Sequence, residues 1–301
     1  MTILVAMILD ALFGEPRVVW DRWPHPAILM GRVIAAAEAR FNQGEMRRAK
    51  GAAVIAALVV ISFTSFALLS ALPGIGPLAE ILIGAALLAQ KSLIDHVRAV
   101  AGSLRYGVGE GRQAVSMIVG RDTRDMSEAE VARAAIESAA ENFSDGLVAP
   151  LFWFVLLGLP GLVTYKLVNT ADSMIGHRTP RYEAFGWAAA RLDDVLNLIP
   201  ARLTALVLAI SALSKSSLRI AIRDAGAHRS PNAGWPEGAM AGALDVALSG
   251  PRSYNGQHQD LPWVNPNGDH RLGPAQIDKA CTLLWRTWGL CFGIVALVVI
   301  L

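Results

Sequence analysis

The sequence carries little charge for its length. Of its 301 residues, 17% are Asp, Glu, Lys or Arg and 53% are hydrophobic, and the mean hydropathy is +0.42. This composition excludes an ordinary soluble domain as the default and favours an integral membrane protein. The net charge of +2 also lacks the clustered basic footprint of nucleic-acid binding, so no nucleic-acid partner is expected.

Cysteine is scarce, and the common nucleotide signatures are absent. Cys281 and Cys291 fit neither a zinc clip nor a disulfide framework and are expected to pack within one apolar helix. The chain has no G-x-x-x-x-G-K-[ST], no G-x-G-x-x-G and no G-x-S-x-G. Any nucleotide must therefore be held without a phosphate-binding loop or a dinucleotide fingerprint.

Apolar blocks predict an all-α, polytopic integral membrane protein with broken or re-entrant helices and cytoplasmic helical segments. The blocks cover about residues 51–72, 76–90, 147–168, 195–213 and 282–301. The first two form a hairpin, because "LPGIGP" separates two halves that are each about long enough to span a bilayer. We expect the whole chain, 1–301, to form a single membrane-embedded enzyme domain.

Two of these blocks contain helix-breaking residues. The third includes "GLPG" at 158–161, and the fourth begins with "NLIPAR" at 197–202. Irregular backbone at membrane depth is tolerated only where protein or a cavity satisfies the freed polar groups. These helices are therefore expected to line a site.

The distribution of Lys and Arg predicts sidedness. Residues 13–50, 91–146 and 214–281 carry seven each, whereas 169–194 carries three. The positive-inside rule then puts the first three segments in the cytoplasm and 169–194 outside. We favour re-entrant helices that return 169–194 to the cytoplasmic side, because it is rich in polar residues. The prediction is a multi-pass protein of the cell (inner) membrane whose active site faces the cytoplasm.

Residues 91–146 are predicted to be soluble and helical. "SEAE" at 127–130 is a capping box that should start a helix over about 128–143. Gly146 is expected to end that helix.

Acidic residues recur along one face of this helix. Glu137, Glu141 and, if the turn continues, Asp145 are four residues apart, within an arc of about 80°. Like charges at this spacing repel. The stripe is therefore either a solvated acidic face or the site of a cation.

A second polar cluster lies in residues 169–202. Its oxygen ligands and arginines are Asn169, Asp172, Arg191, Asp193, Asp194, Asn197 and Arg202. Asn169 shares a helical face with Asp172, and Asp194 shares one with Asn197, each at i, i+3. Such oxygen pairs suit Mg²⁺ with bound phosphate, and arginine forks suit phosphate oxygens. Interhelical hydrogen bonding, with arginines reaching the membrane interface, is the alternative.

Two further stretches place polar residues at turns. Residues 224–244 form a Gly/Pro/Ser/Asn loop whose amides are candidates to cradle an anion, followed by a helix with Glu237 in its first turn. A plain surface loop is equally compatible. Residues 9–26 contain tight turns, for which a structural role is the alternative. The polar residues there are Asp10, Glu15 and His25.

Taken together, four stretches resemble the adenosylcobinamide-phosphate synthase family, membrane enzymes of cobalamin biosynthesis. They are "LDALFGEP" with "HP" at 25–26, "ESAAENFSDGLVAPLFW", "NTADSMIGHRTPRYEAFGWAAARLDDVLNLIPARLTA", and "SPNAGWPEGAMAGAL" followed by "GPRSYNG". They lie in order over most of the chain, and their joint occurrence is far more specific than any one motif.

The resemblance implies a carbon–nitrogen (acid–amine) ligase. Such an enzyme would join the propionate carboxylate of adenosylcobyric acid to aminopropanol phosphate or a related amino alcohol, using ATP and Mg²⁺. Metal and arginine would stabilise an acyl phosphate, and a carboxylate would take the proton of the amine. The corrinoid is a large, partly apolar disc, so membrane lipid is an expected neighbour. The sequence leaves both a monomer and a homo-oligomer open.

Residue roles follow from the resemblance by matching position. The implied catalytic and metal-binding residues are Glu141, Asp145, Asp172 and Asp194. The implied substrate-binding residues are Asp10, Glu15, His25, Asn142, Asn169, His177, Arg191, Asn197, Arg202, Ser230, Asn232 and Glu237. All are expected to converge on one pocket at the cytoplasmic side.

Two other classes of function stay open. A Mg²⁺-dependent membrane transferase would also pair carboxylates at helix ends, but "RLDD" is only a fragment of an Asp-rich signature. A secondary transporter would suit broken helices, although no repeat relates two halves of the chain. Only the ligase predicts stoichiometric consumption of ATP.

Overall fold

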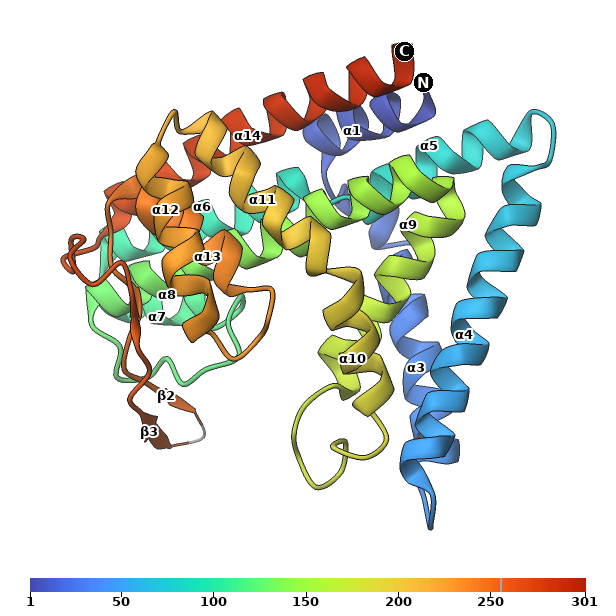
Figure 1. Ribbon diagram of the computed structural model, residues 1–301, viewed down its shortest axis with the longest axis horizontal. Coiled ribbons are helices and arrows are strands. Elements are labelled where there is room, and N and C mark those ends of the chain that lie inside the picture. Colours follow the sequence, from blue (N-terminus) through green and yellow to red (C-terminus); the bar gives the residue numbers. More distant parts are fainter. Residues whose placement is uncertain (255) are drawn as a thin grey trace. The chain divides into compact units, whose positions relative to one another are not determined.

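A computed structural model describes residues 1–254 and 256–301, and it is almost entirely helical (Figure 1). The helices are α1 (Thr2–Phe13), α2 (Arg17–Trp20), α3 (Pro26–Phe41), α4 (Arg47–Ser70), α5 (Ile75–Leu87), α6 (Gln90–Tyr106), α7 (Val108–Val115), α8 (Glu128–Phe143), the π-helix η1 (Ser144–Val148), α9 (Ala149–Ile175), α10 (Trp187–Leu196), α11 (Leu198–Ser211), α12 (Lys215–Asp224), the 3-10 helix η2 (Ala225–Ala227), α13 (Gly234–Leu244) and α14 (Pro274–Ile300). Short antiparallel pairs join β1 (Leu248–Ser249) to β4 (Trp263–Val264) and β2 (Arg252–Tyr254) to β3 (Gln257–Gln259).

The membrane prediction is confirmed by helix length and composition. Within the described chain, four helical runs are long and apolar enough to cross a membrane, and α10 with α11 makes a fifth if that pair counts as one span. The four runs are Arg47–Ser70, Ile75–Tyr106, Glu128–Ile175 and Pro274–Ile300. The protein is therefore an all-α polytopic membrane protein.

The predicted helix breaks are present. Gly158 has φ 66° and ψ −159° inside α9, so it interrupts the helix two residues before Pro160. The chain also breaks at Asn197, where α10 has ended and α11 has not begun. Proline lacks an amide hydrogen and glycine tolerates positive φ, which explains the first break.

The chain divides into two compact units, each described by itself. Unit 1 comprises residues 1–91, 145–197 and 298–301, and unit 2 comprises 92–144 and 198–297. In unit 1, α9 packs along α4, and α10 packs against both. The core of unit 1 includes Ile55 of α4, Leu167 of α9 and Ala189 of α10.

Unit 2 is built around closely packed helices (Figure 1). Helix α13 packs against α8, α11 and α12. A Cβ atom on Gly238 would lie 2.7 Å from the Cα of Ala221, and one on Gly242 would lie 2.7 Å from the Cα of Ser217. These glycines let the backbones of α12 and α13 approach each other, which larger residues would prevent.

The predicted bounds of α8, about 128–143, are confirmed, but the prediction that Gly146 stops it is wrong. Ser127 and Glu130 form the capping box, and α8 spans Glu128–Phe143. Gly146 does not stop the helix, because it lies in η1, which leads directly into α9. The Gly146 carbonyl accepts a hydrogen bond from the amide of Ala89 at 3.1 Å. The absence of a side chain at Gly146 lets its backbone lie close to the segment between α5 and α6. Gly146 does not have the positive φ of a helix-ending glycine.

A polar clamp in unit 1 holds the loop between α9 and α10 against α3. Arg181 donates from Nε to Oε1 of Glu38 at 3.0 Å and from Nη2 to Oε2 at 2.9 Å. Asn42 donates to the Arg181 carbonyl at 3.0 Å and to Glu38 at 2.8 Å. Bidentate pairing of this kind fixes geometry as well as charge.

This clamp predicts a pH dependence of stability. The hydrogen bonds from Arg181, with a further one from Asn42, lower the pKa of Glu38 below its ordinary 4.5. A lowered folded-state pKa stabilises the protein above the unfolded-state pKa, and that stabilisation is lost as pH falls through the folded-state value. Thermal stability should therefore drop below about pH 4.5 in the wild type and drop less in Glu38→Gln. Glu45→Gln, an exposed control nearby, should keep the wild-type profile. Equal slopes for wild type and Glu38→Gln would contradict this role.

Candidate active site

The last turns of α9 and the helix α10 form a polar cluster in unit 1. Asp193 accepts hydrogen bonds from Asn169 Nδ2 at 3.2 Å and from Asn197 Nδ2 at 3.0 Å. The Tyr165 hydroxyl donates to Asn197 Oδ1 at 2.9 Å. Asp193 is 9% exposed and Asn197 2%, so these amides satisfy a buried carboxylate that would otherwise be costly.

Two predicted metal ligands belong to the same neighbourhood. Asp145, Asp172 and Asp193 all lie close enough to act electrostatically on Tyr165. Asp145, Asp193 and Glu15 act in the same way on Lys166. Unit 1 thus brings together carboxylates from three stretches that are far apart in the sequence.

Asp172 fills a space that only glycine leaves open. A Cβ atom on Gly176 would collide with Oδ1 of Asp172. The Gly176 amide also donates to the Asp172 carbonyl at 2.7 Å, closing α9. The Asp172 carboxylate therefore lies against the C-terminal end of α9.

The oxygen chemistry of the unit 1 cluster fits Mg²⁺. Among the residues that the structure describes, no three His, Cys, Asp or Glu side chains gather as a ready-made metal site. Mg²⁺ usually takes one or two protein carboxylates and completes its shell with water and substrate phosphate. Asp145 and Asp172 would supply that number of carboxylates if both bound the ion.

The structure selects Asp193 rather than Asp194 as the partner of Asn197. Asp194 instead pairs with Arg191 at 3.2 Å, and the Arg191 side chain is 57% exposed. The sequence paired Asp194 with Asn197 at i, i+3, whereas the observed bond joins Asp193 and Asn197 at i, i+4. The phase of α10 decides which of two adjacent carboxylates faces Asn169.

The N-terminal residues take structural roles. Buried Asp10 accepts a hydrogen bond from the amide of Gln90, the first residue of α6, at 3.0 Å. His25 Nδ1 accepts from the Ala27 amide at 3.2 Å and so caps α3, while its Nε2 lies 2.9 Å from the Ala86 carbonyl. Both ring nitrogens of His25 are therefore engaged within the fold. Glu15 is exposed.

His177 also lies in unit 1, at the start of the loop after α9. Its side chain is exposed, and its carbonyl accepts a hydrogen bond from the Thr179 amide at 2.9 Å. The structure gives it no contact with the carboxylate cluster among the interactions described.

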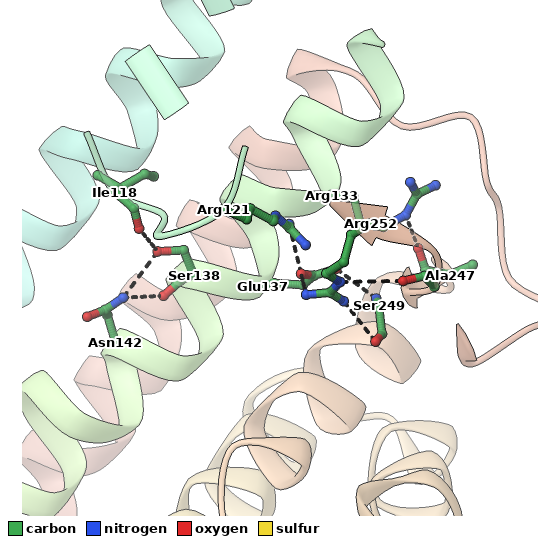
Figure 2. Close-up of polar contacts among 10 residues, drawn as sticks. Ile118, Arg121, Arg133, Glu137, Ser138, Asn142, Ala247, Ser249 and Arg252 are labelled. Carbon is green, nitrogen blue, oxygen red and sulfur yellow. Dashed lines mark hydrogen bonds and ion pairs between the residues drawn. The ribbon is translucent and has the colours of Figure 1, made fainter. Parts of the chain in front are cut away.

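Unit 2 contains a separate polar cavity of about 250 Å³. Oε2 of Glu137 in α8 forms ion pairs with Arg121 Nη2 at 2.9 Å and with Arg252 Nη1 at 3.0 Å (Figure 2). The Ser249 amide donates to Glu137 Oε1 at 2.7 Å. Glu137 is 5% exposed, so a solvated acidic face is the wrong interpretation for this residue.

Glu237 reaches the same cavity from α13. It lies in the first turn of α13, as predicted, and is 4% exposed. Burial, followed by the neighbouring Glu137, raises the pKa of Glu237 well above its ordinary value, and Arg252 opposes the shift. Within the described chain, Glu237 Oε2 has no hydrogen-bond partner, and neither has Arg121 Nε.

Glu141 and Asn142 lie at the edge of this cavity. Both are exposed. Asn142 donates to the Ser138 carbonyl at 2.8 Å and to its Oγ at 3.1 Å, and the Ser138 hydroxyl donates to the Ile118 carbonyl at 2.8 Å (Figure 2). Asn142 is thus held by α8 and the 116–120 segment.

The loop before α13 does not present its amides to an anion. The Ser230 amide donates to His228 Nδ1 at 3.0 Å. The amides of Asn232 and Ala233 donate to Ser230 Oγ at 3.2 Å and 3.3 Å. For these three amides the anion-cradle prediction is wrong, because side chains of the loop already use them.

Arg202 of α11 binds this loop in unit 2. Its Nη1 donates to Asn232 Oδ1 at 3.2 Å, and its guanidinium lies 4.7 Å from the centre of the Trp235 ring. Asn232 is buried. The geometry anchors the loop to α11.

Arg121 and Arg252 were missing from the predicted site residues, and Asp193 was named only as a neighbour within the second polar cluster. Arg252 lies in the quoted "GPRSYNG", so the motif itself was a signal for it. Arg121 lies in an unremarkable loop, and its role becomes visible only through Glu137, to which it bonds.

Fold and site define a polytopic membrane protein with two buried, charged polar clusters. The family model described as CobD/Cbib protein matches residues 3–284. The chain belongs to this family, which confirms the resemblance predicted from the sequence motifs.

Named relatives cover nearly the whole chain. Cobalamin biosynthesis protein CobD of Sinorhizobium sp is 48% identical over 305 residues, 93% of this chain and 94% of that protein. The protein of the same name from Brucella suis biovar 1 (strain 1330) is 48% identical over 307 residues, 97% of this chain and 94% of the relative. The Rhizobium meliloti (strain 1021) protein is 46% identical over 299 residues, 94% and 91% of the two chains. No solved structure gives a significant match.

Proposed function

We propose that this chain forms an amide bond between the propionate carboxylate of adenosylcobyric acid and aminopropanol phosphate, or a related amino alcohol, at the expense of ATP. Family membership and the names of the relatives support a role in cobalamin biosynthesis. The observation that carries the specific reaction is the gathering of Asp145, Asp172 and Asp193 around Tyr165 in unit 1.

The reaction needs activation because a carboxylate does not accept an amine. The propionate oxygen attacks the γ-phosphorus of ATP, so a P–O bond forms to the carboxylate and ADP leaves. The amine nitrogen then attacks the carbonyl carbon, forming the C–N bond as the C–O bond to phosphate breaks. Inorganic phosphate departs, and the nitrogen gives its excess proton to a protein carboxylate.

The residues proposed for this chemistry are of two kinds, candidates to hold the metal ion and residues that surround them. Asp145 and Asp172 would hold Mg²⁺, and Glu141 and Asp194 remain further candidates at their separate positions. When bound, Mg²⁺ would neutralise charge on the transferred phosphoryl group. Asn169 and Asn197 hold Asp193 in place, and Lys166 lies within electrostatic reach of Asp145.

The membrane setting suits the same proposal. Helix α9 carries Tyr165, Asn169 and Asp172 in the part that follows the Gly158 break, where a partly apolar corrinoid could rest beside lipid. We further propose that the site faces the cytoplasm at the inner membrane, where ATP is available.

Stoichiometry tests the proposed reaction directly. Purified protein in detergent, given ATP, Mg²⁺, adenosylcobyric acid and aminopropanol phosphate, should release ADP and amide product in a 1:1 ratio, as expected for an acyl phosphate route. Omission of the amine should stop net turnover of the amide product. Amide formation without ATP consumption, or transport of the corrinoid without amide formation, would contradict the proposal.

A further inference from the structure

Helix α4 faces lipid along most of its length. Only 6% of its most apolar stretch is buried within the protein, and Ile61 and Leu68 are 60% and 72% exposed. Residues 51–70 rise about 30 Å at roughly 1.5 Å per residue, which matches the thickness of the hydrocarbon core of a bilayer. The first turn of α4, residues 47–50, therefore lies in the headgroup layer of one leaflet.

Four cations gather where α3 ends and α4 begins, and we call them the cationic collar. They are Arg40 in the last turn of α3 and Arg47, Arg48 and Lys50 in α4. Residues 40–50 contain one carboxylate, Glu45, so four cations against one anion leave a net charge of +3. Among the residues that the structure describes, no member of the collar forms an ion pair with a carboxylate. The positive charge of the collar is thus open to a partner outside the chain.

The start of α4 is held against the loop before α10 (Figure 1). A Cβ atom on Gly51 would collide with the Phe185 carbonyl oxygen, so the two backbones lie in contact. Arg47 Nη2 donates to the carbonyls of Pro180 and Arg181 at 2.8 Å and 3.0 Å. This loop therefore lies on the same side of the membrane as the collar.

Arg48 is positioned by an aromatic ring of the same unit. Its guanidinium lies 3.9 Å from the centre of the Trp187 ring, and Trp187 is 40% exposed. An arginine stacked on an aromatic ring keeps its N–H groups at the edge of the guanidinium plane, where phosphate oxygens bind. Tryptophan is also enriched at the membrane–water interface. Arg48, which is exposed, thus presents a preorganised cation at headgroup depth.

We propose that the cationic collar binds the headgroup phosphate of an anionic phospholipid in the leaflet where α4 begins. The positive-inside rule assigns that leaflet to the cytoplasmic side, because residues 13–50 carry seven Lys and Arg. A zwitterionic headgroup carries its own ammonium group beside the phosphate, so it gains less from the collar. Each Lys or Arg near an anionic surface strengthens binding by about fivefold.

A fluorophore beside the collar reports which lipid lies there. Bimane is attached at A49C, an exposed position between Arg48 and Lys50. Cys281 and Cys291 are buried, so labelling is selective. The full-length protein is reconstituted in bilayers of phosphatidylglycerol and phosphatidylcholine in equal amounts, with a nitroxide near the top of one acyl chain on either lipid. Quenching should give a relative binding constant at least about fivefold in favour of phosphatidylglycerol. Equal quenching by the two labelled lipids would overturn the proposal.

Paired variants assign the preference to the collar. R48Q/K50Q, in the A49C background, should reduce the preference for phosphatidylglycerol to within about twofold. R124Q/R229Q removes two cations from exposed positions of unit 2 and should keep the wild-type preference. The same preference in both pairs would contradict the collar as the binding surface. Should R48Q/K50Q fail to fold, the comparison of the two labelled lipids on the unchanged collar still decides.

A soluble phosphate separates a lipid surface from a site for free anions. Glycerol 1-phosphate at millimolar concentration offers the same phosphate chemistry without acyl chains, and it should leave quenching by labelled phosphatidylglycerol unchanged. Displacement of the labelled lipid by glycerol 1-phosphate would overturn the assignment to lipid. Neither ATP nor the corrinoid enters these measurements, so their outcome is independent of the proposed reaction.

Discussion

Replacing Asp172 with alanine should abolish ATP-dependent amide formation. Asp172 is proposed to share Mg²⁺ with Asp145, and its carboxylate lies in the space above Gly176. Loss of one preorganised electrostatic contact to a transferring group typically costs about 10²-fold or more in kcat. Asp172→Asn should lose activity similarly while keeping the side-chain shape. Turnover is measured with the protein purified from the membrane fraction.

Two controls keep this result interpretable. The Asp172→Ala protein should still insert in membranes, since the apolar blocks are untouched. Glu45→Ala changes an exposed carboxylate in the same unit and should retain activity. Wild-type turnover by both Asp172→Ala and Asp145→Ala would refute the metal assignment.

Replacing Glu137 with alanine should destabilise the protein by about 3–5 kcal/mol, the usual cost of removing one partner from a buried ion pair. Glu137 receives two arginines and the Ser249 amide (Figure 2). Its loss would leave Arg121 and Arg252, whose side chains are only 7% and 11% exposed, without their shared carboxylate. The free energy of unfolding in detergent measures the effect.

A graded series strengthens the test of this ion cluster. Glu137→Gln keeps an acceptor for the Ser249 amide and should be destabilised less than Glu137→Ala. Glu110→Gln, on the exposed surface of α7, should stay near wild type. A loss below about 1 kcal/mol for Glu137→Ala would mean that the cluster behaves like an exposed ion pair.

Local signals predicted much of the fold. Apolar runs located the long helices, and the Ser127 capping box located the start of α8, because these features depend only on nearby residues. The break in α9 followed from Gly158 and Pro160. The prediction that Gly146 ends a helix was wrong, because its small size instead allows a backbone contact with Ala89, which is distant in the sequence.

The site was only partly accessible from the sequence. Spacing drew attention to Asn169 and Asp172, but it could not tell whether Asp193 or Asp194 faces them, since that depends on how the loop before α10 sets the helix phase. Arg121 and Arg252 meet at Glu137 from positions more than a hundred residues apart. Such long-range pairs leave no periodic pattern in the chain.

Oxygen-isotope transfer tests the central claim of the account, activation of the corrinoid carboxylate by ATP. Adenosylcobyric acid labelled with oxygen-18 in its propionate carboxylate is turned over with ATP and aminopropanol phosphate, and the inorganic phosphate is analysed by mass spectrometry. An acyl phosphate route predicts that each phosphate released carries one labelled oxygen. Phosphate without label, alongside formed amide, would contradict the account.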